Sequence, residues 1–160
     1  MIQIKKAPHG GVAVSGELHL LLDTTKSQHD DSISIITEPE RGRNQGATIN
    51  LPGEYELKGV VVRGYAGPRY TFVIRDGLTM LYAPTQPTAA LLNNIKDNFG
   101  EIACVVAPSI RDVGSIVAIL NPSVWITWEQ PAKIENLKAE RVNSVSLNPK
   151  KLTPTNYFLS

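Results

Sequence analysis

The sequence predicts a mixed fold (α+β / α/β) in which a mostly antiparallel sheet comes first and α/β units follow. In the first half, short alternating or β-branched runs are separated by turn residues, and Asp76-Gly77 between two such runs is a strong hairpin signal. In the second half, apolar runs alternate with segments of helical spacing, which favours parallel strands joined by right-handed crossovers. This pattern indicates sheet layers covered by helices. It leaves open which of several α/β or α+β sandwiches forms.

Strands are predicted in the first half wherever apolar residues alternate or β-branched residues cluster. The stretches 8–11, 26–31 and 38–44 are predicted as turns or loops because they are polar or rich in Gly and Pro. The expected strands are 1–6, 11–15, 18–22, 32–37 and 47–50, then a strand, bend and strand within 51–64, and the pair 70–75 and 78–82.

A helix is predicted after Pro84, with Pro87 at an early helical position where its missing N–H costs little. Apolar residues then recur at helical spacing at Ala90, Leu91, Ile95 and Phe99. A second helix is expected over 111–120, and 132–137 is expected to form a helical turn. The remaining expected strands are 102–107, 124–128 and 144–147.

Composition indicates an ordinary globular protein, and the 160 residues fit one domain, 1–160. The net charge is +1 with scattered Lys and Arg, which argues against binding driven by nucleic acid or a membrane surface. There is no apolar run approaching the ~20 residues of a membrane span and no signal-peptide pattern, so a cytoplasmic location is expected. The single cysteine, Cys104, is predicted to be a buried core residue.

The stretch 51–64, LPGEYELKGVVVRG, is the most specific part of the sequence. It resembles the Pro-Gly-Glu-Tyr-Glu-x-x-Gly-Val segment of zinc-dependent hydrolases of the metallo-β-lactamase fold. The resemblance follows the order of elements along nearly the whole chain at low identity. It implies a shortened metallo-β-lactamase-like αββα sandwich in which some helices are cut down or absent.

The same resemblance implies that every metal-ligand position of the family is replaced in this chain. The family's His-x-His-x-Asp-His motif would follow the strand at 32–37, the next His would follow the hairpin at 51–64, and 65–69 contains none. Within the motif, Glu38 and Glu40 take the positions of the His pair, Gly42 that of the Asp and Arg43 that of the final His. Thr85 lies near the position of the bridging Asp, and Trp128 or Glu129 near that of the last His. No cofactor is therefore expected, and Arg41, Arg43, Thr85 and Trp128 are candidates for the mouth of a degenerate site.

The residues themselves offer little for a histidine-based zinc site. His9, His19 and His29 lack the close spacing of a metal-binding pair, and a turn, strand or loop position explains each of them. A carboxylate site for Mg²⁺, Mn²⁺ or Ca²⁺ is the sharper alternative, formed at one edge by Asp23, Glu38, Glu40 and Glu129. Arg41 and Arg43 next to the glutamates equally suit a salt-bridged loop, and Asp23 could bond backbone amides of the next turn.

Three functional hypotheses follow. The first is a catalytically degenerate protein of this fold that acts as a binding or structural subunit. The second is a metal-dependent hydrolase with a carboxylate-substituted site. The third is a nucleic-acid accessory protein, for which only Arg41, Arg43, Arg63 and Arg69 are available.

Partner predictions rest on the shortened fold and on the tryptophans. Because lost helices would leave apolar surface uncovered, a homo-oligomer, most simply a dimer, is expected, and a protein partner is a further possibility. Trp125 and Trp128 lie three apart on one predicted strand, so one should face the core and the other the opposite side.

Overall fold

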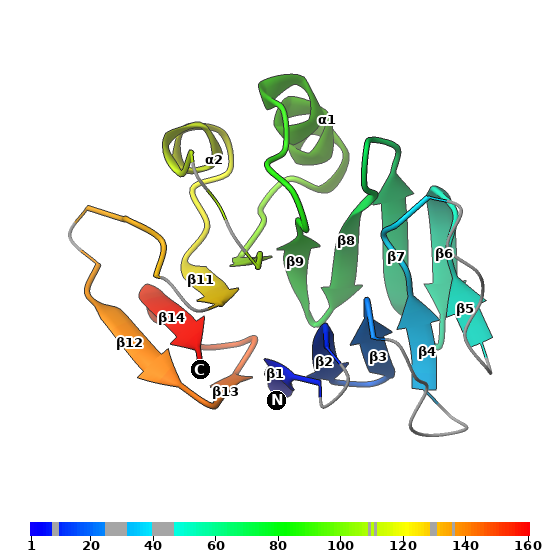
Figure 1. Cartoon of the computed structure of the whole chain (residues 1–160), viewed down its shortest axis with the longest axis horizontal. Coiled ribbons are helices and arrows are strands. Elements are labelled where there is room, and N and C mark those ends of the chain that lie inside the picture. Colours follow the sequence, from blue (N-terminus) through cyan, green and yellow to red (C-terminus); the bar gives the residue numbers. More distant parts are fainter. Residues whose placement is uncertain are drawn as a thin grey trace.

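The computed structural model contains two β-sheets packed face to face, with helices against the outer side of one of them (Figure 1). The strand orders are β13-β1-β2-β3-β4-β5 in the six-stranded sheet and β12-β14-β11-β10-β9-β8-β7-β6 in the eight-stranded sheet. The description covers residues 1–7, 10–24, 32–39, 47–108, 110, 112–128, 131–135 and 137–160.

The six-stranded sheet is antiparallel at one side and parallel at the other. Its strands β13, β1, β2 and β3 pair antiparallel, and β3, β4 and β5 pair parallel. The bounds are β1 Ile2–Lys6, β2 Val12–Ser15, β3 His19–Leu22, β4 Ser32–Ile35, β5 Ala47–Ile49 and β13 Ser144–Leu147.

The eight-stranded sheet begins as an antiparallel meander and continues with parallel strands. Strands β6 to β9 pair antiparallel in sequence order, and β9, β10, β11, β14 and β12 pair parallel. The bounds are β6 Gly53–Leu57, β7 Val60–Tyr65, β8 Thr71–Asp76, β9 Leu78–Tyr82, β10 Cys104–Val106, β11 Val124–Trp128, β12 Ala139–Val142 and β14 Thr155–Leu159.

Two helices cover the eight-stranded sheet. Helix α1, Ala89–Phe99, starts at the N-cap Thr88, whose hydroxyl accepts a hydrogen bond from the Leu91 amide, and it ends at Gly100 with φ 71°. Helix α2 is Gly114–Ile119. Both pack their apolar sides onto the same sheet, so the part of the chain that the structure describes has one helix layer rather than two.

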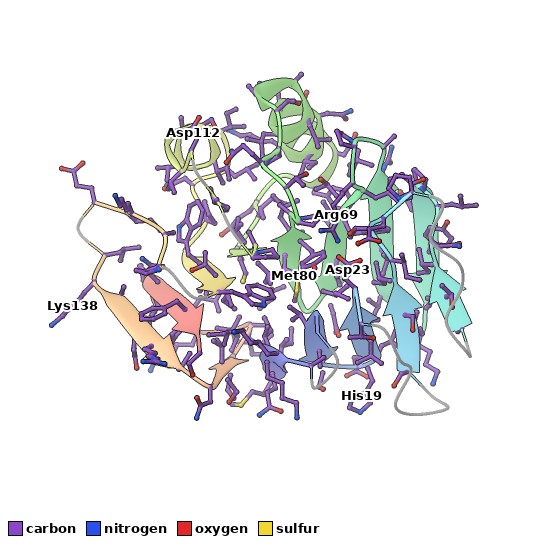
Figure 2. The ribbon with its side chains drawn as sticks, viewed as in Figure 1. His19, Asp23, Arg69, Met80, Asp112 and Lys138 are labelled. Atoms are coloured by element: carbon purple, nitrogen blue, oxygen red, sulfur yellow. The ribbon has the colours of Figure 1, made fainter. Side chains whose placement is uncertain are left out.

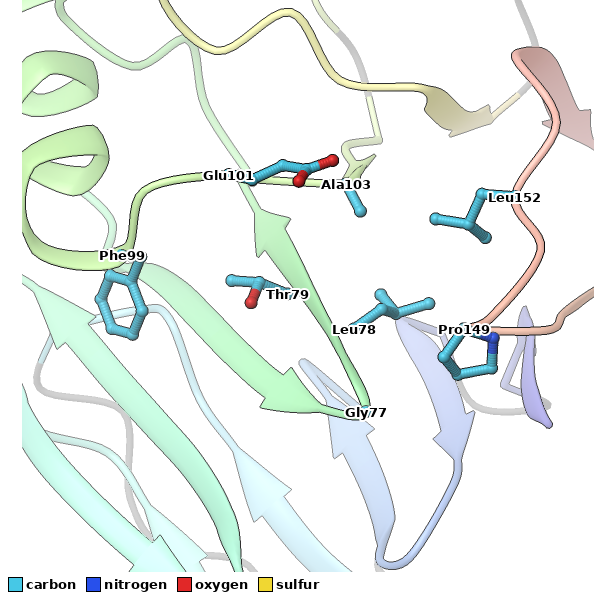
Figure 3. Close-up of a pocket in the computed structure, with 8 residues that line it drawn as sticks. All are labelled: Gly77, Leu78, Thr79, Phe99, Glu101, Ala103, Pro149 and Leu152. Carbon is cyan, nitrogen blue, oxygen red and sulfur yellow. The ribbon is translucent and has the colours of Figure 1, made fainter.

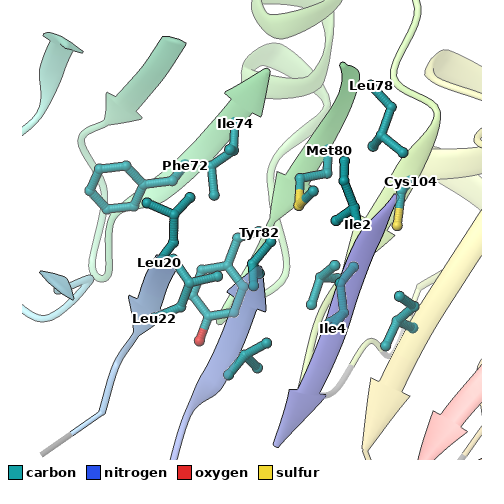
Figure 4. Packing of buried hydrophobic residues seen from close by; sticks show 14 of the residues in the cluster. Ile2, Ile4, Leu20, Leu22, Phe72, Ile74, Leu78, Met80, Tyr82 and Cys104 are labelled. Atoms are coloured by element: carbon teal, nitrogen blue, oxygen red, sulfur yellow. The ribbon is translucent and has the colours of Figure 1, made fainter. Parts of the chain in front are cut away.

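Alternation along the strands divides the apolar residues into two cores. Between the sheets, side chains of β1 and β3 such as Ile4 and Leu20 meet Phe72, Ile74 and Met80 of the meander (Figure 4). On the other face of the eight-stranded sheet, Val73, Leu81 and Trp125 meet Leu92 and Ile95 of α1 and Ile116 of α2. The sandwich is held together by this burial on both faces of one sheet.

The predicted fold is confirmed, including the hairpins at 51–64 and at Asp76-Gly77, the parallel second half and the reduction in helices. Two details were wrong. Pro87 precedes the N-cap of α1 instead of lying inside the helix, and β12 and β14 were not predicted as strands. At 132–137 the described residues contain one turn, closed by the Leu137 amide donating to Ile134 O at 3.3 Å, and no longer helix.

A buried carboxylate at the β8–β9 turn joins the two sheets at one end. The Asp76 side chain accepts a hydrogen bond from the Glu17 amide at 3.0 Å, and Glu17 belongs to the turn between β2 and β3. A Cβ on Gly16 would overlap the Asp76 carboxylate. Only glycine therefore lets the two turns approach so closely.

Among the described residues, the structure contains no helix that is both long enough and apolar enough to cross a membrane.

Replacing Gly16 by Ala is expected to destabilise the protein by about 1–3 kcal/mol, because the new methyl group displaces the buried Asp76 carboxylate. Thermal and urea unfolding measure this change. Gly114→Ala is the matched control, since its Cβ would meet Asp112 at an ordinary 3.4 Å at the start of a helix. Equal stability of the two variants would contradict the importance of this contact.

Candidate functional site

Four polar side chains meet at the edge of the sandwich where β3, β4 and β9 end. Asp23 follows β3, Thr37 follows β4, Tyr82 is the last residue of β9, and Arg69 lies just before β8. The backbone guides this convergence, because the Asp23 amide donates to Ile35 O at 2.9 Å and the Tyr70 amide donates to Thr37 O at 2.6 Å. Figure 2 shows Asp23 and Arg69 facing one another at this edge.

Asp23 is turned into the edge by an unusual backbone conformation. Its φ is 54°, in the left-handed region that Asp tolerates better than most residues. Gly11 packs directly against this turn, where a Cβ would overlap the carbonyl of Leu22. The side chain of Asp23 is 8% exposed as a result.

The Asp23 carboxylate accepts four hydrogen bonds from residues that the structure describes. Oδ1 receives the Thr37 amide at 2.8 Å. Oδ2 receives the Thr37 hydroxyl at 2.6 Å, Arg69 Nη2 at 2.9 Å and the Tyr82 hydroxyl at 2.9 Å. Each carboxylate oxygen offers two lone-pair sites, so Oδ2 with its three donors is fully engaged, whereas Oδ1 has one donor among the described residues.

Arg69 supplies the positive charge of the site. Its Nη2 contacts Asp23 and also donates to the Thr37 hydroxyl at 2.7 Å, and it lies 3.9 Å from a carboxylate oxygen of Glu38. The arginine side chain is 32% exposed, so one side of the guanidinium reaches solvent while its Nε is buried without a hydrogen-bond partner. The Arg69 guanidinium thus lies between the Asp23 carboxylate and solvent.

Tyr82 acts as a neutral donor. Burial raises the pKa of its hydroxyl far above the ordinary value, and the negative charge of Asp23 and their hydrogen bond raise it further. The positive charge of Arg69 lowers the Tyr82 pKa, but by less than the other effects raise it. The phenol therefore keeps its proton and donates a hydrogen bond to Asp23.

Of the predicted carboxylates, the structure brings Asp23 and Glu38 together around Arg69. Asp23 bonds the backbone amide of Thr37, which lies beyond β4. Most of the turn directly after β3, whose amides were the expected partners, lies outside the described residues. Glu38 is half exposed at 51%. Glu40, Arg41, Gly42, Arg43 and Glu129 lie outside the described residues, as do His9 and His29.

The other predicted mouth residues are less central. Thr85 is exposed beyond the end of β9. Trp128 is half-buried at the end of β11 and packs against the inter-sheet core, whereas Trp125 is buried under the helices. The two tryptophans thus face opposite sides of the sheet, as predicted. Arg63 lies away from the mouth, where it pairs with Glu54 at 3.3 Å and stacks on Tyr65.

Sequence reasoning missed Thr37 and Tyr82 and did not connect Arg69 with Asp23. Hydrogen-bond donors on separate strands carry no spacing signal, since the fold alone brings them together. A signal existed for Arg69, which lies in the segment 65–69 where the resemblance places a missing histidine.

The described residues at this edge do not fit a metal ion. Oδ2 of Asp23 is occupied by donors, and a guanidinium lies beside it where a cation would repel it. Within the described residues, no group of three or more His, Cys, Asp or Glu side chains is placed to hold a metal. His19 lies on the outer face of the six-stranded sheet, where its Nδ1 is 3.0 Å from Ser15 Oγ.

A separate cavity of about 330 Å³ lies near the opposite end of β9, at the β8–β9 turn (Figure 3). Phe99, Leu78 and Leu152 form apolar walls, and Thr79 and Glu101 add polar atoms. Because Tyr82 at the far end of β9 reaches Asp23, this cavity is distinct from the site at the mouth.

Compared by sequence, the chain matches no family model and none of the curated proteins. Compared by structure, it is similar to a proposed Zn-dependent hydrolase of the metallo-β-lactamase superfamily from Thermotoga maritima. The TM-score is 0.70 at 15% identity, over 99% of this chain and 98% of that chain.

Two further structures are similar over 79% of this chain. A mutant of the CmlA β-hydroxylase aligns with TM-score 0.55 and 11% identity over 45% of its own length. The metallo-β-lactamase fold protein YhfI of Bacillus subtilis aligns with TM-score 0.51 and 9% identity over 85% of its length. The chain therefore has the metallo-β-lactamase fold.

Replacing Arg69 by Met is expected to cost about 2–3 kcal/mol of folding free energy, because the buried Asp23 carboxylate loses its cation. Arg63→Met is the control, since it removes an exposed pair worth at most about 1 kcal/mol. In the double variant with Asp23→Asn, the cost should fall below the sum of the single changes. Strict additivity in urea unfolding would show that Asp23 and Arg69 are not coupled.

Cys104 is expected to be inert as a nucleophile. It is fully buried, and burial raises its pKa to about 12. The thiol should therefore react with an aromatic disulfide reagent only when the protein unfolds, with native labelling slower by several orders of magnitude. Rapid labelling of the native protein near pH 8 would contradict this.

Proposed function

We propose that this protein is a catalytically degenerate member of the metallo-β-lactamase fold that acts as a binding or structural subunit. The observation that supports the proposal is the bonding of Asp23. Its carboxylate lies at the strand-end edge where the resemblance places the family's site, and its oxygens are taken by Thr37, Arg69 and Tyr82.

Arg69 gives the proposal its physical basis. A guanidinium stays protonated at any physiological pH and cannot ligate a metal, so it neutralises Asp23 permanently. It has no lone pair to act as a base, and it offers no open coordination position to activate water. Arg69 thus holds the strand ends together through Asp23, and neither residue of this pair supplies a hydrolytic group.

The main alternative is a hydrolase whose site uses Asp23, Glu38 and Glu40. The 3.9 Å separation of Glu38 from Arg69 and the exposure of Glu38 leave that carboxylate available to a cation. Asp23 would have to exchange Arg69 and Tyr82 for the metal, which makes this alternative the weaker one.

A nucleic-acid accessory role has less support. Phosphate binding needs accessible cations, and the two described candidates are engaged, Arg69 with Asp23 and Arg63 with Glu54. A flat salt dependence of DNA or RNA binding would remove this role.

The test is the metal content of protein purified without a histidine tag, measured by elemental mass spectrometry. The proposal predicts less than about a tenth of an equivalent of transition metal and no thermal shift with Mn²⁺, Zn²⁺ or Mg²⁺. Stoichiometric metal that disappears in Glu38→Ala, but not in the distant control Glu101→Ala, would contradict the proposal and establish the carboxylate metal site that the alternative requires.

A further inference from the structure

Strands β5 and β6 are edge strands of the two sheets and lie on the same side of the sandwich (Figure 1). Large exposed apolar side chains among the described residues are Met1 at 83% and Leu51 at 61%, and Leu51 lies between β5 and β6. The described residues therefore expose little apolar surface, so uncovered apolar surface gives weak support to the predicted oligomer. The open strand edge gives a different reason.

Strand β6 has backbone groups directed away from its own sheet. Lys58 and Gly59, with φ of 50° and 80°, form a two-residue turn, so Leu57 and Val60 are the hydrogen-bonded pair next to it. Hydrogen-bonded and non-hydrogen-bonded pairs alternate along an antiparallel ladder. The N–H and C=O groups of Glu54 and Glu56 consequently point outward from the sheet edge.

We propose that β6 pairs antiparallel with β6 of a second copy, extending the eight-stranded sheet across a twofold axis. If the twofold axis is perpendicular to the sheet, one residue of β6 lies opposite the same residue of the second copy, and this residue marks the centre of the pairing. Centred on Tyr55, it would place Glu54 opposite Glu56 twice, which sets like charges side by side. Centred on Glu54, it would place Pro52, which has no N–H, in a hydrogen-bonded position.

A centre at Glu56 satisfies the edge best. It places Tyr55 opposite Leu57 of the second copy on the inner face, and it brings the side chain of Glu54 twice beside Lys58, the turn residue just beyond the end of β6. Tyr55 and Leu57 are half-buried and already pack against the inter-sheet core, so this pairing extends that core. A centre at Leu57 would pair fewer residues, because β6 ends there.

The charged groups around the pairing are few in the described residues. Glu54 is 61% exposed and contacts Arg63 on its own chain at 3.3 Å, so it can reach Lys58 of the second copy without losing a buried partner. The pair of Glu56 side chains at the axis is the unfavourable contact. The proposal rests on the strand edge alone, so its failure would leave the proposed function untouched.

Light scattering coupled to size exclusion and sedimentation velocity test the dimer. The expected mass is about 35 kDa, twice the 17.5 kDa chain. Glu56→Pro removes an outward N–H without breaking the β6–β7 ladder, and it should give a folded monomer. Glu56→Thr is its control and should dimerise several-fold more tightly, because it removes the like-charge pair.

A charge swap tests the register. Glu54→Lys and Lys58→Glu should each weaken dimerisation roughly tenfold, and the double variant should restore it. Circular dichroism and melting confirm that each variant folds. A monomer at tens of micromolar protein, or a dimer unaffected by Glu56→Pro, would overturn the interface. Single swaps without rescue in the double variant would overturn the Glu56-centred register.

Discussion

The structure depends on neutralising one carboxylate at an apolar sheet edge. Asp23 leaves β3 in a left-handed conformation that points it inward, where an unpaired negative charge would cost several kcal/mol. Thr37, Arg69 and Tyr82 come from three other points of the chain to satisfy it. The ends of β3, β4 and β9 are fixed by the same contacts, so the edge of both sheets forms around this carboxylate.

A guanidinium and a metal ion solve the same electrostatic problem with different consequences. Either one can hold a carboxylate and join neighbouring strands through it. A metal ion must be acquired and is lost to chelators, whereas Arg69 is part of the chain. A metal can also bind and activate water, which a guanidinium cannot. Under the proposed function, a guanidinium in place of a metal ion keeps the strand ends together and gives up hydrolytic chemistry.

Much of the fold was predictable because its signals are local. Asp76-Gly77 and the 51–64 segment predict hairpins through turn chemistry, and α1 is predicted by apolar spacing. β12 was missed because Ala139-Glu140-Arg141-Val142 is a polar edge strand with no clear alternation. Among the described residues, the turn expected at 132–137 is limited to one hydrogen bond from the Leu137 amide to Ile134 O at 3.3 Å, and Asn156 of β14 donates to Ala132 O of the same segment at 2.7 Å.

The site was less predictable than the fold. Asp23 and Glu38 were identified because carboxylates at strand ends are recognisable. Arg69 was overlooked as their partner because arginine is not a metal ligand, and Tyr82 because an aromatic residue ending an apolar strand suggests only packing.

The central claim is that Arg69 permanently occupies Asp23. Side-chain ¹⁵N NMR of arginine, assigned with Arg69→Lys, tests it while diamagnetic Zn²⁺ is titrated. The account predicts that the chemical shift of Arg69 Nε is unchanged at stoichiometric Zn²⁺, whereas a shift of that resonance to the position of a solvent-exposed arginine would contradict it.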